Sequence, residues 1–198
     1  KICVKIGEMD YYQFQIPSQG KAKFPNRKLP IDPYVLGVWI GDGCRNSGSY
    51  VKNDLEVKTE IESRGYKVST YIQEDRCTVN NIHGLITSLK EIDLSDKYSF
   101  QKFIPETYKT SSIQQRKDLL AGLMDTYGTI DKRDHCMEYD TSSEQLAKDV
   151  QWLIRSLGGK TTLSTKRSFI GKVEHRLCYR VRVILDFNPF KLTRKAKY

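Results

Sequence analysis

The chain has 198 residues and a mass of 22.9 kDa, which is enough for one large or two small domains with a buried core. Charged residues make up 29% and hydrophobic residues 38%, a composition typical of globular rather than disordered chains. No apolar run approaches the roughly 20 residues of a membrane span, and no signal peptide is evident, so we expect no membrane segments. The odd and scattered set of cysteines favours a reducing intracellular compartment.

The charge balance favours a polyanionic partner. Lys and Arg number 33 against 24 Asp and Glu, a net charge of +9. Nucleic acid is the first candidate and an acidic membrane the second, with a merely basic protein as the alternative. The five cysteines and three histidines are scattered, which argues against a disulfide framework, a zinc knuckle and a Cys–His nucleophile. No nucleotide-binding glycine motif is present.

Residues 1–30 are expected to form an N-terminal arm, or what remains of another unit. They contain two strand-like runs, at 2–6 and 11–16, and then turn-rich basic sequence. Asp32 and Pro33 open a helix that runs to residue 40, because Asp is a good N-cap and Pro suits the first helical turn. The next expected elements are a helix at 53–65, a strand pair at 67–73 and 76–80, and a helix at 82–92.

The same order then recurs. A helix is expected at 112–125, strands at 129–131 and 137–139, a helix at 142–157, and strands at 160–165 and 177–185. Asp42 and Tyr127, 85 residues apart, follow equivalent helices, which indicates an internal two-fold repeat. We therefore divide the chain into halves at 31–110 and 111–190 and a basic tail at 191–198, although a common α+β order can also recur by chance.

Two of the expected helices contain small residues in their interior, which is unusual for amphipathic helices. Residues 36–43 (LGVWIGDG) and 120–128 (LAGLMDTYG) contain internal glycines, each costing about 1 kcal/mol relative to Ala. Small residues let two helix backbones approach closely, which would bring the C-terminal ends together. A carboxylate at each end would then form a metal-binding pair. The alternative is two buried helices that simply end at glycines.

These segments resemble the two motifs of the LAGLIDADG (dodecapeptide, DOD-type) homing endonucleases, of the kind encoded in inteins. Residues 102–106 (KFIPE) resemble the lysine block between the motifs, and residues 143–159 resemble the block after the second motif. The resemblance covers 31–190. It implies an α+β fold of two pseudo-symmetric αββαββα halves, with the motif helices at the interface and the strands forming a DNA-binding saddle.

The resemblance also implies a site that uses a divalent cation, usually Mg²⁺. The metal-binding acid of the first motif is Asp42, whereas the second motif has Tyr127. A phenol is a poor Mg²⁺ ligand at neutral pH. The carbonyls of Gly41 and Thr126 fall where the motif ends also touch metal.

The same resemblance places Lys102 at the catalytic lysine and Arg176 near its counterpart in the second half. An Arg cannot shed its proton, but it can stabilise negative charge on a phosphate. Without the resemblance, Asp42 would be interpreted as a helix-terminal turn residue and Lys102 as a surface lysine.

Strand alternation predicts the DNA-facing side chains, because alternate residues share one face. An ordinary solvated face is the alternative. The contacts predicted from alternation are Lys67, Ser69, Tyr71 and Gln73 in the first half, and Arg180 and Arg182 in the second. Lys160, Lys166 and Arg167 are added as basic residues of the adjoining loops.

Three functions remain open. The first is a Mg²⁺-dependent, site-specific endonuclease acting as a monomer on a long, near-asymmetric double-stranded DNA target. The second, prompted by Tyr127, is a decayed relative that binds or only nicks DNA. The third is RNA-maturase or transcription-factor use of the fold. The chain has no His-Asn dipeptide, so we expect no protein splicing by it alone and interpret 1–30 as a remnant of a splicing domain.

Overall fold

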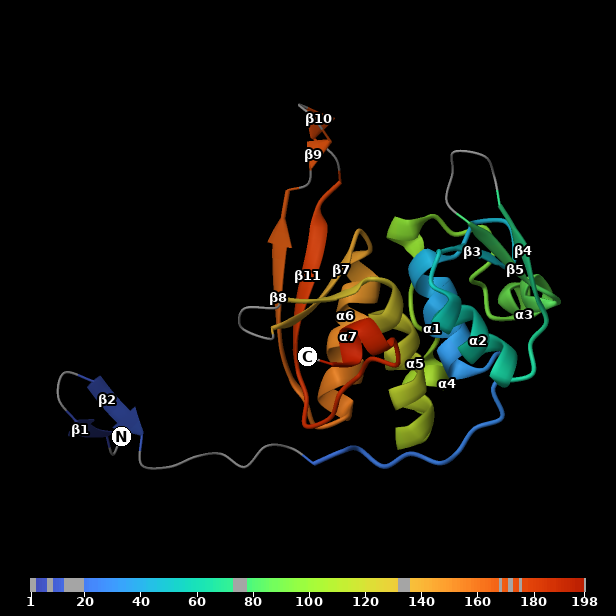
Figure 1. Ribbon diagram of the computed structural model, residues 1–198. Coiled ribbons are helices and arrows are strands. Elements are labelled where there is room, and N and C mark those ends of the chain that lie inside the picture. The colour runs from blue at the N-terminus through green and yellow to red at the C-terminus, as the bar shows by residue number, and fades with distance from the viewer. Residues whose placement is uncertain are drawn as a thin grey trace.

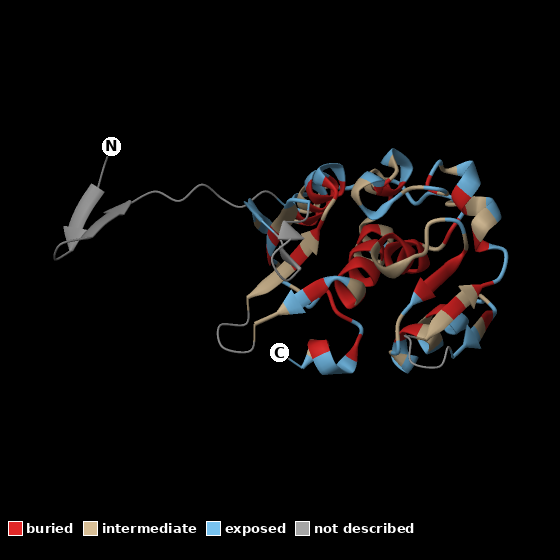
Figure 2. Cartoon of the chain, turned by 90° about the horizontal axis from the view of Figure 1, so that it is seen from above, coloured by how far each residue is buried: buried red, intermediate tan, exposed pale blue. Residues whose placement is uncertain are grey.

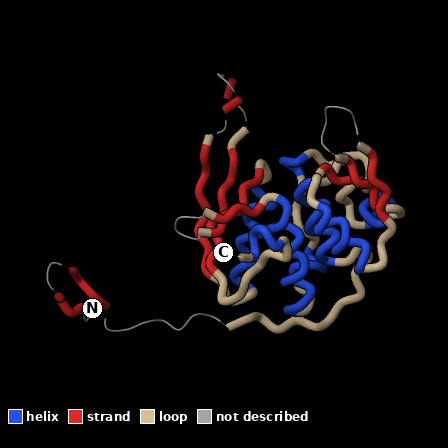
Figure 3. Tube along the Cα trace, viewed as in Figure 1, coloured by secondary structure: helices blue, strands red, loops and turns tan. Residues whose placement is uncertain are grey.

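Two larger antiparallel sheets lie on either side of a central helix pair, α1 (Pro33–Asp42) and α5 (Ile113–Thr126) (Figure 1). Figure 3 shows the same division into outer strands and inner helices. The computed structural model describes residues 3–6, 9–12, 20–72, 78–131, 136–167, 169–170, 173–174 and 176–197. No helix within these ranges is long and apolar enough to cross a membrane.

The first half has a three-stranded sheet of order β3-β5-β4. Gly43 forms a single bridge with Tyr50, in the place where the second half has a full strand. After α1, the elements are β3 (Ser49–Val51), α2 (Leu55–Ser63), β4 (Val68–Tyr71), β5 (Val79–Ile82), α3 (Leu85–Glu91), the 3₁₀ turn η1 (Ser99–Gln101) and α4 (Glu106–Lys109).

The second half has a four-stranded sheet of order β6-β7-β11-β8. After α5, the elements are β6 (Gly128–Ile130), β7 (Met137–Thr141), α6 (Glu144–Ser156), β8 (Lys160–Lys166), β9 (Phe169–Ile170), β10 (Val173–Glu174), β11 (Cys178–Ile184) and α7 (Thr193–Ala196). A separate N-terminal hairpin pairs β1 (Cys3–Ile6) with β2 (Met9–Tyr12). The mixed α+β class and the repeated order of elements are confirmed.

The caps of the central helices are those expected of their sequences. Asp32 accepts hydrogen bonds from the backbone N–H groups of Tyr34 and Val35, and Pro33 occupies the first turn. Ser112 and Gln115 form a reciprocal capping box at the start of α5. Both helices therefore begin at residues fixed by local sequence.

The two helices cross at Gly37 and Gly122. A Cβ atom placed on either glycine would lie 3.0 Å from the Cα atom of the other, so no side chain fits at the crossing. Every residue of α1 from Pro33 to Ile40 is buried, as the red central helices of Figure 2 show. The closely packed helices α1 and α5 form the interface between the two halves.

Residues 20–30 are docked on the second half. Gln115 accepts from the backbone N–H of Arg27 and donates to its carbonyl, at 3.1 and 2.7 Å. The buried guanidinium of Arg116 donates to the carbonyl of Ala22. The described part of the predicted N-terminal arm from residue 20 onward is therefore tied to α5.

The helix crossing gives a direct stability test. Gly122→Ala should lower the free energy of unfolding by about 1–3 kcal/mol, because the added methyl group would push the two backbones apart. Urea denaturation measures the change. Gly20→Ala is the matched control, since a Cβ there would meet no atom within 4 Å. Equal midpoints for the two variants would contradict the tight crossing.

Candidate functional site

The C-terminal ends of α1 and α5 meet at one pocket between the sheets. Asp42 is the last residue of α1, and Tyr127 is the C-cap of α5. Both line a pocket that also includes Gly41 and Lys102. The structure therefore brings together four of the site residues predicted from sequence.

The carboxylate of Asp42 is already paired with a cation that the sequence analysis missed. Lys52 Nζ donates to Asp42 Oδ2 at 2.9 Å and to the carbonyl oxygen of Thr126 at 3.4 Å. The Lys52 and Asp42 side chains are only 13% and 18% exposed. One ammonium group thus joins the ends of both central helices.

The second motif offers no carboxylate at this position. Burial, reinforced by the negative charge of Asp42, raises the pKa of Tyr127 above its ordinary value, so the phenol is neutral at pH 7. Asp125 does not replace it. That residue is fully buried and accepts hydrogen bonds from the Tyr34 hydroxyl and from the backbone N–H groups of Lys191 and Leu192.

Lys102 is a buried helix cap rather than a surface lysine. Its ammonium donates to the carbonyls of Trp39, Ile40 and Gly43 at 3.0, 3.1 and 2.9 Å. Burial lowers the pKa of Lys102 to about 8, although the charge of Asp42 opposes the shift. The ammonium form still predominates at neutral pH, and its three protons match the three carbonyls.

Lys195 makes the same contacts in the second half. Its ammonium donates to the carbonyls of Met124, Asp125 and Gly128 at 2.8, 2.9 and 2.6 Å. Each acceptor lies 85 residues after its Lys102 counterpart in the chain. Burial also lowers the pKa of Lys195 to about 8, and the nearby charge of Lys52 adds to the effect.

Two sequence-based assignments are corrected by this symmetry. Lys195 was placed in a basic tail, yet it is buried on the short helix α7 against the end of α5. Arg176 was expected near the position of the second lysine, but it precedes β11, and its guanidinium lies 3.8 Å above the ring of Phe100. Arg176 lines the adjoining pocket beside Tyr127, where its predicted role is untested.

The first sheet follows the predicted alternation only at its start. Thr70 and Ile72, which should face inward by the same alternation, are exposed, because β4 is an edge strand that ends at Tyr71. Val68 is buried, whereas Lys67 and Tyr71 are exposed. Ser69 is half-buried and shares a 2.6 Å hydrogen bond with His83. Gln73 lies outside the described residues. Contact of these side chains with DNA remains a prediction.

The outward face of the second sheet carries basic side chains, and acidic side chains of the same sheet neutralise part of their charge. Arg180 binds both carboxylate oxygens of Asp140, at 3.0 and 3.1 Å, and also pairs with Glu138. Lys166 contacts Asp140 as well. The remaining predicted contacts, Lys160, Arg167 and Arg182, are exposed.

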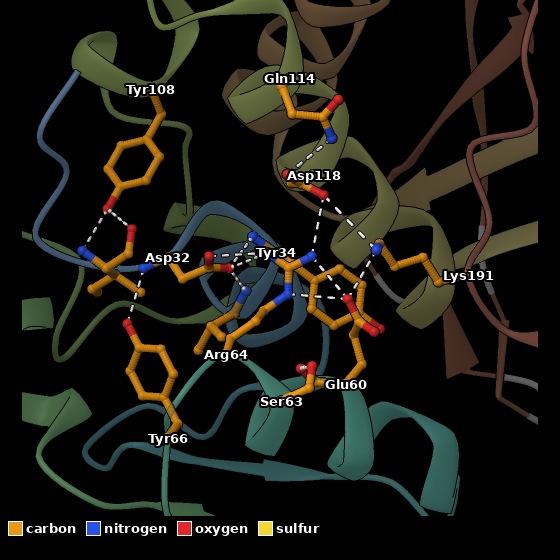
Figure 4. Close-up of polar contacts among 12 residues, drawn as sticks. Asp32, Tyr34, Glu60, Ser63, Arg64, Tyr66, Tyr108, Gln114, Asp118 and Lys191 are labelled. Atoms are coloured by element: carbon orange, nitrogen blue, oxygen red, sulfur yellow. Dashed lines mark hydrogen bonds and ion pairs between the residues drawn. The ribbon is translucent and has the colours of Figure 1, made fainter. Parts of the chain in front are cut away.

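An ion-pair network ties the halves together near the start of α1 (Figure 4). The guanidinium of Arg64 contacts Asp32 and Glu60 in the first half and Asp118 in the second. Lys191 also pairs with Glu60, at 2.8 Å. These groups fix the relative position of the halves away from the pocket.

The site presents two oxygen donors that could take part in binding a divalent cation. Among the described residues, no three His, Cys, Asp or Glu side chains are close enough to form a metal centre. Asp42 Oδ2 and the Thr126 carbonyl are nevertheless hard oxygen donors of the kind that Mg²⁺ prefers. Both already contact one cationic group, the ammonium of Lys52. The residues present therefore fit a cation that completes its shell with phosphate or water.

Curated relatives match over most of this chain but over little of their own length. Replicative DNA helicase DnaB from Mycobacterium intracellulare is 30% identical over 172 residues, which are 87% of this chain and 27% of the helicase. DnaB from Synechocystis sp. is 28% identical over 155 residues, 66% of this chain and 18% of that protein. The chain thus spans about a quarter or less of the length of these relatives.

Solved structures of homing endonuclease I-DmoI share the fold. Its mesophilic variants match with a TM-score of 0.57 at 14% identity, covering 85% of this chain and 95% of theirs. Two variants in complex with their target DNA, in the presence of Mn and of Mg, each give a TM-score of 0.53 at 14% and 13% identity. They cover 78% of this chain and 86% and 88% of those chains. Residues 103–186 also match the family model named homing endonuclease, and the chain has the fold of I-DmoI.

Proposed function

We propose that the chain is a site-specific DNA endonuclease, encoded in an intein, that depends on a divalent cation such as Mg²⁺. The observation that carries the proposal lies at the paired helix ends. There the Asp42 carboxylate and the Thr126 carbonyl contact the same cationic group, the ammonium of Lys52. Alignment with only part of each helicase supports an insertion within a DnaB chain. Such an enzyme would act inside the cell, on the DNA of its host gene.

The residues at the pocket divide into ligands and positioning groups. Asp42 and the carbonyls of Gly41 and Thr126 would hold the cation, which would activate water and neutralise the leaving oxygen. Lys102 and Lys195 each give three hydrogen bonds to backbone carbonyls, so they position the helix ends. Their positive charge also favours a phosphate nearby.

The partner that fits the two sheets is double-stranded DNA. The I-DmoI structures with target DNA support this choice, and the exposed cations of β8 and β11 would provide phosphate contacts. Both motifs lie in one chain, which favours a monomer. The two outward faces carry different side chains, which favours a long, near-asymmetric target.

Nicking of a single strand is the second candidate function. The neutral phenol of Tyr127 stands where the first half has Asp42, so only one side of the pocket has a charged ligand. The second active site is therefore degraded in this proposal, and double-strand cleavage would be slow or absent.

The Tyr127 proposal predicts a gain of function. Tyr127→Asp should raise the rate of plasmid linearisation relative to the parent, because a second carboxylate becomes available to a cation. A time course with supercoiled target plasmid at equal Mg²⁺ measures it, with Tyr127→Asn as the uncharged control. Asp42→Asn should abolish cleavage and leave binding largely intact. A parent that linearises as fast as Tyr127→Asp would show that position 127 does not limit catalysis.

DNA binding should be strongly salt-dependent. If the sheets neutralise on the order of 6–10 phosphates, affinity should fall about 10³–10⁵-fold between roughly 50 and 200 mM salt. Arg182→Gln should reduce the slope of log affinity against log salt by about 1, since one phosphate contact is lost. Lys90→Gln, exposed on α3, is the charge-matched control. A flat plot for the parent protein would contradict a DNA-binding surface.

The two buried lysines should be equally important for stability. Lys102→Met and Lys195→Met should each lower the free energy of unfolding by on the order of 1–3 kcal/mol, because buried carbonyls lose their donors. Lys197→Met, at an exposed position beside α7, is the control. Chemical denaturation distinguishes them. The symmetry assignment fails if Lys195→Met unfolds at the same denaturant concentration as Lys197→Met.

A further inference from the structure

Lys52 occupies the position in which the pocket would hold a cation. Its ammonium lies 2.9 Å from Asp42 Oδ2 and 3.4 Å from the Thr126 carbonyl oxygen. These are two of the oxygen donors assigned above to the divalent ion. A metal ion bound to the same oxygens would face a full positive charge at contact distance, which is strongly unfavourable.

The backbone of Lys52 is fixed, whereas its side chain can leave. Its N–H donates to the Thr78 carbonyl at 3.1 Å, and its own carbonyl accepts from the Asn80 side chain at 2.9 Å. Asn80 lies in β5 and Thr78 immediately precedes it, so the backbone of Lys52 is held by the sheet. The flexible four-carbon stem of a lysine can still carry the ammonium to another acceptor without backbone movement.

The second half lacks both members of this pair. Tyr50 bridges Gly43 as Tyr139 pairs with Gly128, which aligns the two segments. By this alignment Lys52 corresponds to Thr141, just as Asp42 corresponds to Tyr127. The lysine is present only in the half that carries the acid, as expected of a counter-ion for that acid.

We propose that Lys52 is an internal counter-ion that competes with the divalent cation for the Asp42–Thr126 position and thereby sets metal affinity. The inference rests on the proposed metal-dependent function. In the metal-free protein the ammonium neutralises the Asp42 carboxylate, which lies at the negative end of a helix dipole. Metal binding requires the ammonium to move to solvent or to a DNA phosphate. Lys52 is a positioning residue rather than a metal ligand.

Direct titration of Mn²⁺ tests the competition without reference to cleavage. Free Mn²⁺ is followed by electron paramagnetic resonance with the parent protein, Lys52→Met and Lys58→Met. Lys58→Met removes the same charge from the same half, but Lys58 contacts Glu62 and Thr70 rather than Asp42. Lys52→Met should bind Mn²⁺ about tenfold or more tightly than either comparison protein, because an adjacent charge has been removed.

Thermal stability provides the second measurement. In EDTA, Lys52→Met should melt at a lower temperature than Lys58→Met, because Asp42 has lost its partner. Saturating Mn²⁺ should raise the melting temperature of Lys52→Met more than that of the parent, because binding to the folded state stabilises it. A lysine with only a structural role would lower stability without enlarging the Mn²⁺ effect.

The outcomes separate this inference from the proposed function. Equal or weaker Mn²⁺ binding by Lys52→Met, with binding still lost in Asp42→Asn, would overturn the competition and leave the metal site in place. No Mn²⁺ binding by the parent and Lys52→Met alike would overturn both. Undiminished binding by Asp42→Asn would also overturn both, because the metal would then lie elsewhere.

Discussion

The close crossing of α1 and α5 at Gly37 and Gly122 is the constraint from which the pocket follows. Because neither residue has a side chain, the backbones touch and the two helix C-terminal ends arrive side by side. The last carbonyls of a helix lack intrahelical donors and carry the negative end of its dipole. Two such ends in one place form a strongly cation-attracting position before any acidic side chain is added.

Lysines supply the cations at these helix ends. Lys102 and Lys195 each give three hydrogen bonds to equivalent carbonyls of their own half, while Lys52 joins the halves at Asp42 and Thr126. Burial lowers the pKa of both capping lysines to about 8, so the folded protein holds their charge at some cost. The field that would attract a divalent ion is thus balanced by residues that are part of the fold.

Sequence patterns were sufficient for elements fixed by neighbouring residues. The cap at Asp32 and the capping box at Ser112 are local, and the resemblance supplied the pairing of Asp42 with position 127. The contact between Lys52 and Asp42 could not be predicted from local sequence, because the bridge between Gly43 and Tyr50 is what brings the two residues together.

Other contacts also depend on tertiary structure. Lys195 lies 67 to 71 residues from its acceptors, so no local pattern reports its role. The alternation of β11 predicted an outward Arg180, but its neutralisation by Asp140 depends on the pairing of β11 with β7. Arg176 lies just before β11, as expected, but Lys195 is the residue that caps the end of α5.

The two halves balance charge at the pocket in different ways. The first half holds a half-buried pair, Asp42 with Lys52, which a divalent ion would enter only by exchange for the ammonium. The second half has Tyr127 and Thr141 at the equivalent positions, and both are neutral at pH 7. A neutral half needs no counter-ion and offers no charged ligand. The same asymmetry that would weaken cleavage on one side therefore leaves that side stable without metal, whereas the other side depends on a lysine or a metal ion to neutralise its acid.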